Sequence, residues 1–250
     1  MIEVILPVLD EAEALPGVLA AIPEGFAPLV VDNGSSDGSA AIARAHGARV
    51  VTEPQRGFGA ACFAGLSAAG TEIVCFMDAD GSLDPAELPR VSEPVQSGRL
   101  DLALGARRPA RGAWPLHARV ANRLIALELH RRSGIPVSDI GPMRAARRLS
   151  LLALGLGDRA FGWPLEMVLA AADAGWRVGE QPVTYRRRAG GTSKVSGSIR
   201  GTWRAGADMS RLLRSSSVRT VPFTSSHDSA CCDRQAAGGR SGEDAADAAL

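Results

Sequence analysis

Aromatic side chains are scarce in this chain, where they make up 4% of 250 residues and include a single tyrosine. No uninterrupted apolar run approaches the ~18 residues that a membrane-spanning helix needs. The first residues also lack the basic segment that opens a secretory signal peptide. We therefore expect neither a transmembrane helix nor a signal peptide. The apolar content of 46% still predicts a real hydrophobic core.

Cysteine and net charge are also low. The four cysteines, Cys62, Cys75, Cys231 and Cys232, do not have the C-x-x-C spacing of a zinc site. Cys62 and Cys75 lie in apolar segments and are predicted to be buried thiols. Because nothing in this pattern demands an oxidising compartment, we expect a cytoplasmic protein. A net charge of +1 gives no global field that would attract nucleic acid, so no nucleic-acid partner is expected.

Short apolar runs alternate with helical patterns through the first hundred residues. The apolar runs predict buried strands at 2–6, 29–31, 48–52, 72–77 and 100–105. The segments between them predict helices at 15–22, 39–46, 57–69 and 85–96. This order predicts an α/β fold with a mostly parallel central sheet and helices on both faces. Ligands of such sheets bind at the carboxyl ends of the strands.

The pattern changes after about residue 106, where ten arginines fall between residues 107 and 148. Helical periodicity predicts further helices at 116–132, 145–154, 163–174 and 198–214, and an apolar run predicts a strand at 176–185. From residue 215 the chain is rich in Ser, Gly, Ala and Asp, which is typical of disorder. We expect one domain over 1–214, with halves 1–106 and 107–214, followed by a tail over 215–250.

Two carboxylates, Asp78 and Asp80, follow the predicted strand at 72–77. Side chains alternate along a strand, so this spacing points both acids the same way. A divalent cation would relieve their repulsion, and hard oxygen ligands suit Mg²⁺ or Mn²⁺, which also bind phosphate oxygens. For an isolated pair of this kind, an ordinary strand-to-turn junction is the better explanation, so the surrounding sequence has to decide.

Further acids follow two other predicted strands of the same sheet. Residues 7–11 contain Asp10 and Glu11, and the polar loop 32–38 begins with Asp32 and Asn33. Because the carboxyl ends of parallel strands share one edge of a sheet, these loops are predicted to lie near Asp78 and Asp80.

Five motifs in order resemble those of the family-2 glycosyltransferases with the GT-A fold. Residues 7–11 are similar to the P-x-x-N-E opening, with Asp10 for Asn, and residues 31–38 to V-D-D-G-S-x-D-G, with Asn33 for the second Asp. Residues 78–80 match D-x-D, residues 139–144 resemble D-x-x-x-x-R, and residues 188–194 resemble R-x-x-G-x-S-K. The likeness covers roughly residues 2–205 and is greatest to the dolichyl-phosphate mannose synthase-like and polyprenyl-phosphate glycosyltransferase branch.

The resemblance implies a nucleoside-diphosphate sugar donor bound with Mg²⁺ or Mn²⁺ by the half 1–106. Asp80 is implied to bind the metal, Asp78 the ribose or the metal, Glu11 the ribose hydroxyls and Asp32 the base. The remaining implied donor-binding residues are Pro7, Asp10, Asn33, Arg144, Arg188, Ser193 and Lys194. For Arg144, an ordinary surface arginine is the alternative.

The acceptor is less well determined by the sequence. In relatives that transfer to a hydroxyl, an acid near the start of the 163–174 helix serves as general base, and Glu166 occupies that place. A polyprenyl-phosphate acceptor is already ionised and needs no such base, so Glu166 would only position groups. We expect an inverting transferase and favour the polyprenyl phosphate, with a hydroxyl of a small molecule as the alternative.

Segment 186–214 has eight basic residues and one acid. This composition fits a helix on the inner face of the cell membrane as well as a packed final helix with a solvated basic face.

Overall fold

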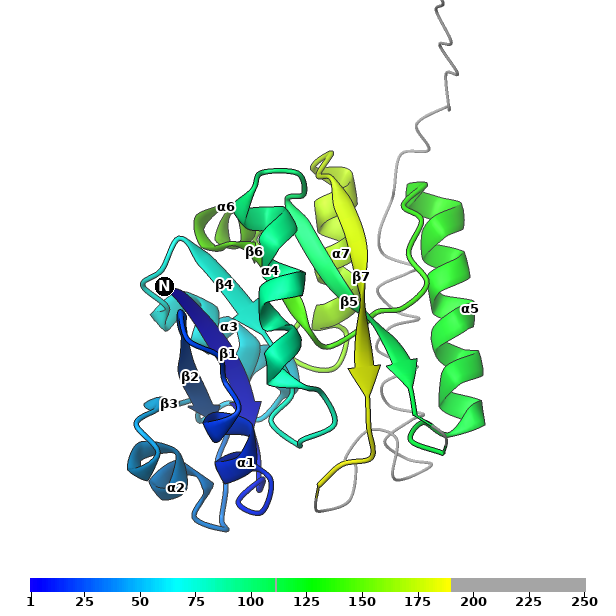
Figure 1. The fold of residues 1–250 in the computed structure, drawn as a ribbon. Coiled ribbons are helices and arrows are strands. Elements are labelled where there is room, and N and C mark those ends of the chain that lie inside the picture. Colours follow the sequence, from blue (N-terminus) through cyan, green and yellow to red (C-terminus); the bar gives the residue numbers. More distant parts are fainter. Residues whose placement is uncertain (111, 190–250) are drawn as a thin grey trace, which may run out of the picture. The chain divides into compact units, whose positions relative to one another are not determined.

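The computed structural model describes residues 1–110 and 112–189 of the chain. They contain a seven-stranded sheet with strand order β3-β2-β1-β4-β6-β5-β7 (Figure 1). Strand β6 is antiparallel to β4 and β5, whereas the other neighbouring strands are parallel. The predicted α/β fold with a mostly parallel sheet is therefore confirmed. The strands are β1 (Ile2–Val8), β2 (Phe26–Asp32), β3 (Arg49–Thr52), β4 (Ile73–Phe76), β5 (Leu102–Pro109), β6 (Arg144–Arg147) and β7 (Val178–Tyr185).

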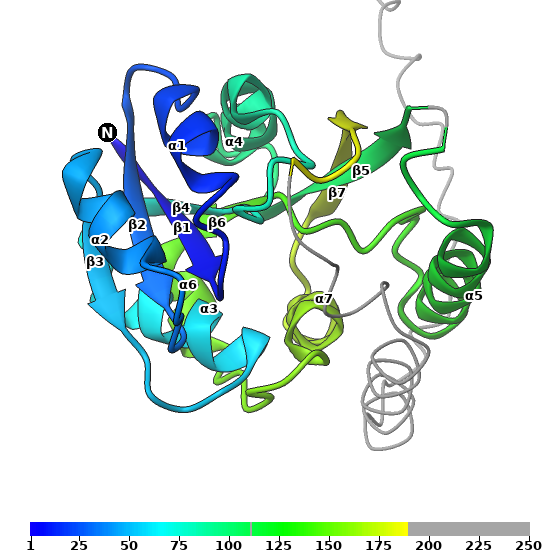
Figure 2. The ribbon, with the colours of Figure 1, turned by 90° about the horizontal axis from the view of Figure 1, so that it is seen from below.

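Helices cover both faces of the sheet (Figure 2). On one face lie α1 (Leu15–Ala20), α2 (Ser39–Ala45) and α4 (Leu88–Gln96), the last preceded by a 3₁₀ turn at Pro85–Glu87. On the other lie α3 (Phe58–Ala68), α5 (Leu116–Ser133), α6 (Arg148–Ala153) and α7 (Trp163–Asp173). Among these residues, no helix combines the length and apolar character needed to cross a bilayer.

The apolar core is divided by the sheet into two clusters. Strand β1 contributes Ile5 to the cluster under α3 and α7, and Val4 and Leu6 to the cluster under α1 and α4. This alternation follows from the two-residue period of a strand. Cys62 and Cys75 are buried free thiols in opposite clusters, which confirms the prediction for both.

The register brings the ends of distant segments to one edge of the sheet. Val8 at the end of β1 pairs with Asp32 at the end of β2. Phe76 at the end of β4 pairs with Arg144, the first residue of β6. Because β6 runs in the opposite direction, the loop before it meets the loops that follow the parallel strands.

The helix predicted over 145–154 is wrong in its first part. Residues Arg144–Arg147 form β6, and α6 begins only at Arg148. Alanine favours helix, but Ala145 and Ala146 are buried between β4 and β5, whose unpaired edges they satisfy. The helix predicted over 198–214 and the tail over 215–250 lie outside the described residues, as do Cys231 and Cys232.

Close packing of α3 on the sheet makes a testable prediction at Gly65. A Cβ there would lie 2.4 Å from Ile5 Cγ2 and 2.9 Å from Val31 Cγ2. We expect Gly65→Ala to lower the free energy of unfolding by about 1–3 kcal/mol through overpacking, despite the higher helix propensity of alanine. Urea unfolding measures this change.

Gly17 in α1 provides the control, because a Cβ there would meet no atom within 4 Å. Gly17→Ala should raise the free energy of unfolding by about 0.5–1 kcal/mol. If both variants are stabilised alike, α3 is not packed against β1 as described.

Candidate functional site

Acidic side chains gather where three neighbouring strands end. Glu11 follows β1, Asp32 is the last residue of β2, and Asp78 and Asp80 follow β4. Asp32 and Asp80 are buried. The structure thus brings together the acids that the sequence predicts at this edge, although their roles stay predictions.

The surroundings of Asp78 disfavour its charged form. Burial, followed by the charge of Asp80, raises the pKa of Asp78 to about 7, against the lowering effect of Arg107 and Arg188. Asp80 is anchored differently, because its Oδ1 accepts a hydrogen bond of 2.8 Å from the backbone N–H of Ser82. This hydrogen bond fixes the orientation of the Asp80 carboxylate.

Arg188 connects two of these acids. Its Nη2 donates to Glu11 Oε1 at 2.8 Å, and its Nε lies 2.8 Å from Asp80 Oδ2. One guanidinium therefore compensates carboxylates that come from different strand ends. Arg188 belongs to the predicted donor-binding set, and the structure places it at the centre of the acids.

The segment that carries Arg188 runs along the loop after β4. Arg186 N donates to Ser82 O at 2.8 Å, and Ala189 N donates to Asp80 O at 3.0 Å. Gly81 has a φ of 75°, and a Cβ there would lie 2.9 Å from Ala189 Cβ. A glycine thus permits both the turn and the close approach. Ser193 and Lys194 lie outside the described residues.

The loop after β1 is clamped to the loop after β2. Asp10 has a φ of 54°, a left-handed conformation that Asn and Asp tolerate better than other side chains. Its Oδ1 accepts from Ser36 N at 2.7 Å, and Glu11 N donates to Ser39 Oγ at 3.0 Å. Asp10 therefore shapes the loop that presents Glu11. Pro7 precedes this loop: it lies inside β1, where it pairs with Val31 of β2.

The side chain of Asn33 forms hydrogen bonds with backbone groups of the loop after β3. Its Nδ2 donates to Glu53 O at 2.9 Å and to Gln55 O at 2.7 Å. Its Oδ1 accepts from Gly57 N at 2.8 Å. An aspartate could not donate these bonds, which explains the amide at this position. The neighbouring Asp32 accepts from Ser35 N at 3.0 Å and ends β2 beside it.

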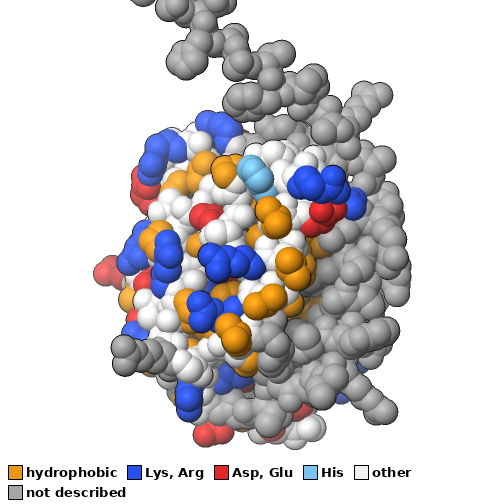
Figure 3. Space-filling model, turned by 90° about the vertical axis from the view of Figure 1, so that its right-hand side faces the viewer, with side chains coloured by type: hydrophobic (Ala, Val, Ile, Leu, Met, Phe, Trp, Pro, Cys, Tyr) orange, Lys and Arg blue, Asp and Glu red, His pale blue; other side chains and the backbone are white. Residues whose placement is uncertain are grey.

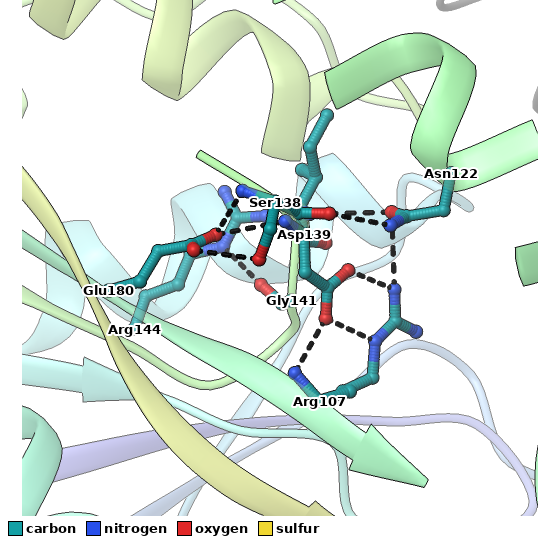
Figure 4. A network of polar contacts seen from close by, with 8 residues as sticks. Arg107, Asn122, Ser138, Asp139, Gly141, Arg144 and Glu180 are labelled. Atoms are coloured by element: carbon teal, nitrogen blue, oxygen red, sulfur yellow. Dashed lines mark hydrogen bonds and ion pairs between the residues drawn. The ribbon is translucent and has the colours of Figure 1, made fainter. Parts of the chain in front are cut away.

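Arg107 forms a network that the sequence did not predict (Figure 4). Its Nε and Nη2 donate to the two oxygens of Asp139 at 2.8 and 2.7 Å. Glu180 of β7 accepts from Ser138 N at 2.7 Å and from Asp139 N at 2.9 Å. Asn122 of α5 accepts from Ile140 N at 3.3 Å. The loop before β6 is thus fixed from three elements.

Two aromatic side chains lie against Arg107. The guanidinium carbon is 3.8 Å from the centroid of a Trp114 ring, and the rings of Trp114 and Tyr185 are 5.8 Å apart. Burial, then the charge of Asp80, raises the pKa of Tyr185, so this cluster adjoins the acids. The sequence gives one sign of this cluster, because Tyr185, the single tyrosine of the chain, ends the strand predicted over 176–185.

Arg144 is buried, so the surface alternative for this residue is wrong. Its guanidinium donates to Gly141 O at 2.8 Å and to Pro164 O at 2.7 Å. Burial lowers its pKa to about 10, which leaves it charged at neutral pH. These contacts tie the loop before β6 to the start of α7, and a phosphate contact stays a prediction.

Glu166, in the first turn of α7, also accepts from backbone. Its Oε1 accepts from Gly157 N at 2.9 Å and its Oε2 from Asp158 N at 2.8 Å. The loop so held supplies Ala160 O and Arg159 O to Gly59 N and Ala60 N at the start of α3, both at 2.9 Å. Glu166 therefore organises a loop, and a role as base stays a prediction.

Comparison with known proteins identifies the family. The family model described as "Glycosyl transferase family 2" matches residues 3–154. The chain belongs to glycosyl transferase family 2. It is 52% identical over 202 residues to an uncharacterized glycosyltransferase of Mycobacterium tuberculosis, covering 80% of this chain and 92% of that protein.

Two further relatives carry more specific names. An undecaprenyl-phosphate mannosyltransferase of Micrococcus luteus is 33% identical, over 79% of this chain and 88% of its own. A polyprenol monophosphomannose synthase of Mycolicibacterium smegmatis is 32% identical, over 78% and 81%.

Solved structures of glucosyl-3-phosphoglycerate synthase from Mycobacterium tuberculosis share the fold. One, with phosphoglyceric acid, has a TM-score of 0.62 and 26% identity over 75% of this chain and 71% of that chain. Another, with Mn²⁺, uridine-diphosphate-glucose and phosphoglyceric acid, has a TM-score of 0.67 and 21% identity over 86% and 80%. The GT-A expectation is thereby confirmed.

The acids of this glycosyltransferase suit a hard divalent cation chemically. Carboxylate oxygens are the ligands that Mg²⁺ and Mn²⁺ prefer. Within 1–110 and 112–189, no group of three or more His, Cys, Asp or Glu side chains is placed to hold a metal. Asp78 and Asp80 would thus supply part of a coordination shell, and a phosphate-bearing ligand and water would supply the rest.

The raised pKa of Asp78 predicts a pH-dependent stability. Because its pKa is higher in the folded chain than in the unfolded chain, the free energy of unfolding should fall as pH rises from about 4 to about 7. Without added metal, Asp78→Asn should be more stable than the wild type at pH 8 by on the order of 2–4 kcal/mol, and this difference should shrink by about half or more at pH 5.

Denaturant titrations at the two pH values measure this difference, with the exposed Asp173→Asn as control. An Asp78→Asn chain that is equally or less stable than the wild type at pH 8 would show that burial and the charge of Asp80 do not destabilise the Asp78 carboxylate.

Proposed function

We propose that this glycosyltransferase is an inverting enzyme that transfers a sugar from a nucleoside-diphosphate sugar to a polyprenyl phosphate with Mg²⁺ or Mn²⁺. The observation that carries the donor half is the meeting of Glu11, Asp78 and Asp80 around the guanidinium of Arg188. The relatives named undecaprenyl-phosphate mannosyltransferase and polyprenol monophosphomannose synthase support the acceptor half.

The donor pocket follows from the strand ends. Asp32 would accept a hydrogen bond from the base, Glu11 would accept from the ribose hydroxyls, and Asp78 and Asp80 would hold the metal that binds the diphosphate. When bound, the metal neutralises charge that develops on the leaving diphosphate. Structures of glucosyl-3-phosphoglycerate synthase that contain Mn²⁺ with uridine-diphosphate-glucose, or Mg²⁺ with uridine diphosphate, support a metal of this kind.

Arg188 serves as the counter-charge within the same pocket. Before the donor binds it neutralises Glu11 and Asp80. A diphosphate that arrives between these acids offers the guanidinium a stronger partner, because Arg binds phosphate oxygens in a bidentate way. Ser193 and Lys194 would complete the diphosphate contacts, with Arg144 supporting the loop behind them.

The acceptor reacts from the opposite side of the sugar. Its oxygen attacks the anomeric carbon as the bond to the diphosphate breaks, so one displacement inverts the configuration. A phosphate oxygen is ionised before it attacks and needs no general base. This suits a site in which both oxygens of Glu166 accept backbone N–H groups.

The alternative acceptor is a hydroxyl of a small molecule. It is favoured by the likeness to a synthase whose structure contains phosphoglyceric acid. In that case Glu166 would act as general base and would have to exchange a backbone partner for the hydroxyl.

With a lipid acceptor, the transfer reaction would take place at a membrane surface. We infer a cytoplasmic enzyme that reaches the lipid phosphate from the inner face of the membrane. The basic segment 186–214 would contribute to this contact, although its residues from 190 onward lie outside the described part of the chain.

The donor pocket is tested by thermal shift with a panel of nucleoside-diphosphate sugars. A donor that binds only the native state raises the melting temperature. We expect one donor to raise it by several °C with Mn²⁺ and less without it. Asp80→Ala should lose the metal-dependent part, whereas Asp173→Asn should keep it. The proposal fails if no donor acts in a metal-dependent way and Asp80→Ala behaves like the wild type.

Glu166→Gln separates the two acceptors. The amide can no longer accept from both Gly157 and Asp158, so we expect a loss of about 1–2 kcal/mol in the free energy of unfolding. Transfer to a polyprenyl phosphate should be weakened less than about tenfold, with an unchanged pH profile. Loss of about 100-fold or more in the rate of a still-folded variant would instead identify Glu166 as a base.

A further inference from the structure

Helix α5 carries a row of exposed apolar side chains. Leu116, Val120, Leu124 and Leu127 are between 50% and 73% exposed, although large apolar side chains are usually buried. Their spacing of four, four and three residues places them on one face of the 18-residue helix. Figure 3 shows apolar side chains gathered with basic ones on this side of the molecule. We call this row the α5 stripe.

The opposite face of α5 is fixed to the protein. Ala126 and Leu129 are buried, and Leu129 belongs to the core cluster shared with α3 and α7. Asn122 accepts from Ile140 N and also donates to Ser138 O at 3.4 Å. The α5 stripe therefore points outward, because the opposite side of the helix packs on the core and forms hydrogen bonds with the loop before β6.

The charges beside the stripe are positive. Arg119 and Arg123 are exposed one turn apart along one side of it. The acid of this helix, Glu128, accepts from Arg131 at 2.8 Å and from Arg132 at 2.6 Å. Helix α5 therefore has four arginines and one glutamate, whose charge is already compensated by two of them. Any partner of the α5 stripe must tolerate positive charge beside its apolar contact.

We propose that the α5 stripe docks on an anionic lipid bilayer, with its leucines inserted at the level of the head groups and Arg119 and Arg123 on lipid phosphates. A helix with an apolar row and a basic border matches this interface. A second copy of the chain fits less well, because a two-fold contact through α5 would bring its arginine rows together. Segment 190–214 is basic as well and would meet the same repulsion.

Docking through α5 would also place the bilayer close to the candidate site. The inner face of α5 holds the loop of Ser138–Ile140, which binds Arg107 through Asp139. This surface needs no donor and no acceptor, so its failure can be distinguished from failure of the proposed transfer.

Vesicle binding by the full-length chain tests the proposal. We expect the wild type to cosediment with vesicles of phosphatidylglycerol and phosphatidylcholine in equal parts, to bind phosphatidylcholine alone more weakly, and to be released by salt. The double variant Leu124→Gln, Leu127→Gln should bind the anionic vesicles at least about tenfold more weakly than the wild type. Arg119→Gln with Arg123→Gln should weaken binding several-fold.

Matched controls keep the result specific. Leu149→Gln removes a leucine that is 69% exposed on α6, and it should bind like the wild type. Arg44→Gln removes an exposed arginine of α2 and should do the same. The melting temperature of the double leucine variant should match that of Leu149→Gln, because Leu124 and Leu127 are about as exposed as Leu149.

Three results would overturn the proposal. The first is a double leucine variant that binds anionic vesicles as tightly as the wild type. The second is a wild-type dimer in light scattering that the double variant converts to a monomer, since the stripe would then bind a second copy. The third is a melting temperature lowered well below that of Leu149→Gln, since residues 190–250 of the same chain would then cover the stripe.

Discussion

Repulsion among carboxylates at one edge of the sheet is the constraint on which the candidate site depends. Asp78 and Asp80 follow a buried strand, and burial, followed by the charge of Asp80, raises the pKa of Asp78 to about 7. Arg188 reduces this repulsion because it forms ion pairs with both Asp80 and Glu11. Its ion pairs, together with backbone hydrogen bonds, hold the segment after β7 against the loop after β4. A nucleotide diphosphate with its metal would enter a site in which Arg188 already compensates two of the acids.

Much of the fold could be predicted from local pattern. Continuous apolar runs marked β1, β4 and β5 because a strand buried on both faces has few polar side chains. Strand β6 could not be found in this way, since Arg144–Arg147 has arginines at both ends and alanines between them. Its conformation is set by the edges of β4 and β5, which only the folded chain brings together.

The site was predictable to a lesser degree. The acids after β1, β2 and β4 were found because their motifs and strand ends agree. Asn33 and Glu166 look like ligands in the sequence, yet each satisfies backbone groups. For Asn33 those groups lie 20 to 24 residues away along the chain, so no local pattern reveals them. Arg107, Trp114 and Tyr185 were missed because their contacts with one another and with Asp139 form only in the folded chain.

The proposed lipid acceptor is supported by these contacts as well as by the relatives named for polyprenyl-phosphate substrates. A site whose one candidate base is engaged by backbone suits an acceptor that arrives ionised, and a basic apolar helix beside it suits a lipid surface. The most direct test is to incubate the full-length chain with a labelled nucleoside-diphosphate sugar, Mn²⁺ and polyprenyl phosphate, and to extract the product. Our account predicts label in the organic phase that mild acid releases. Label found only in a water-soluble, acid-stable glycoside would contradict it.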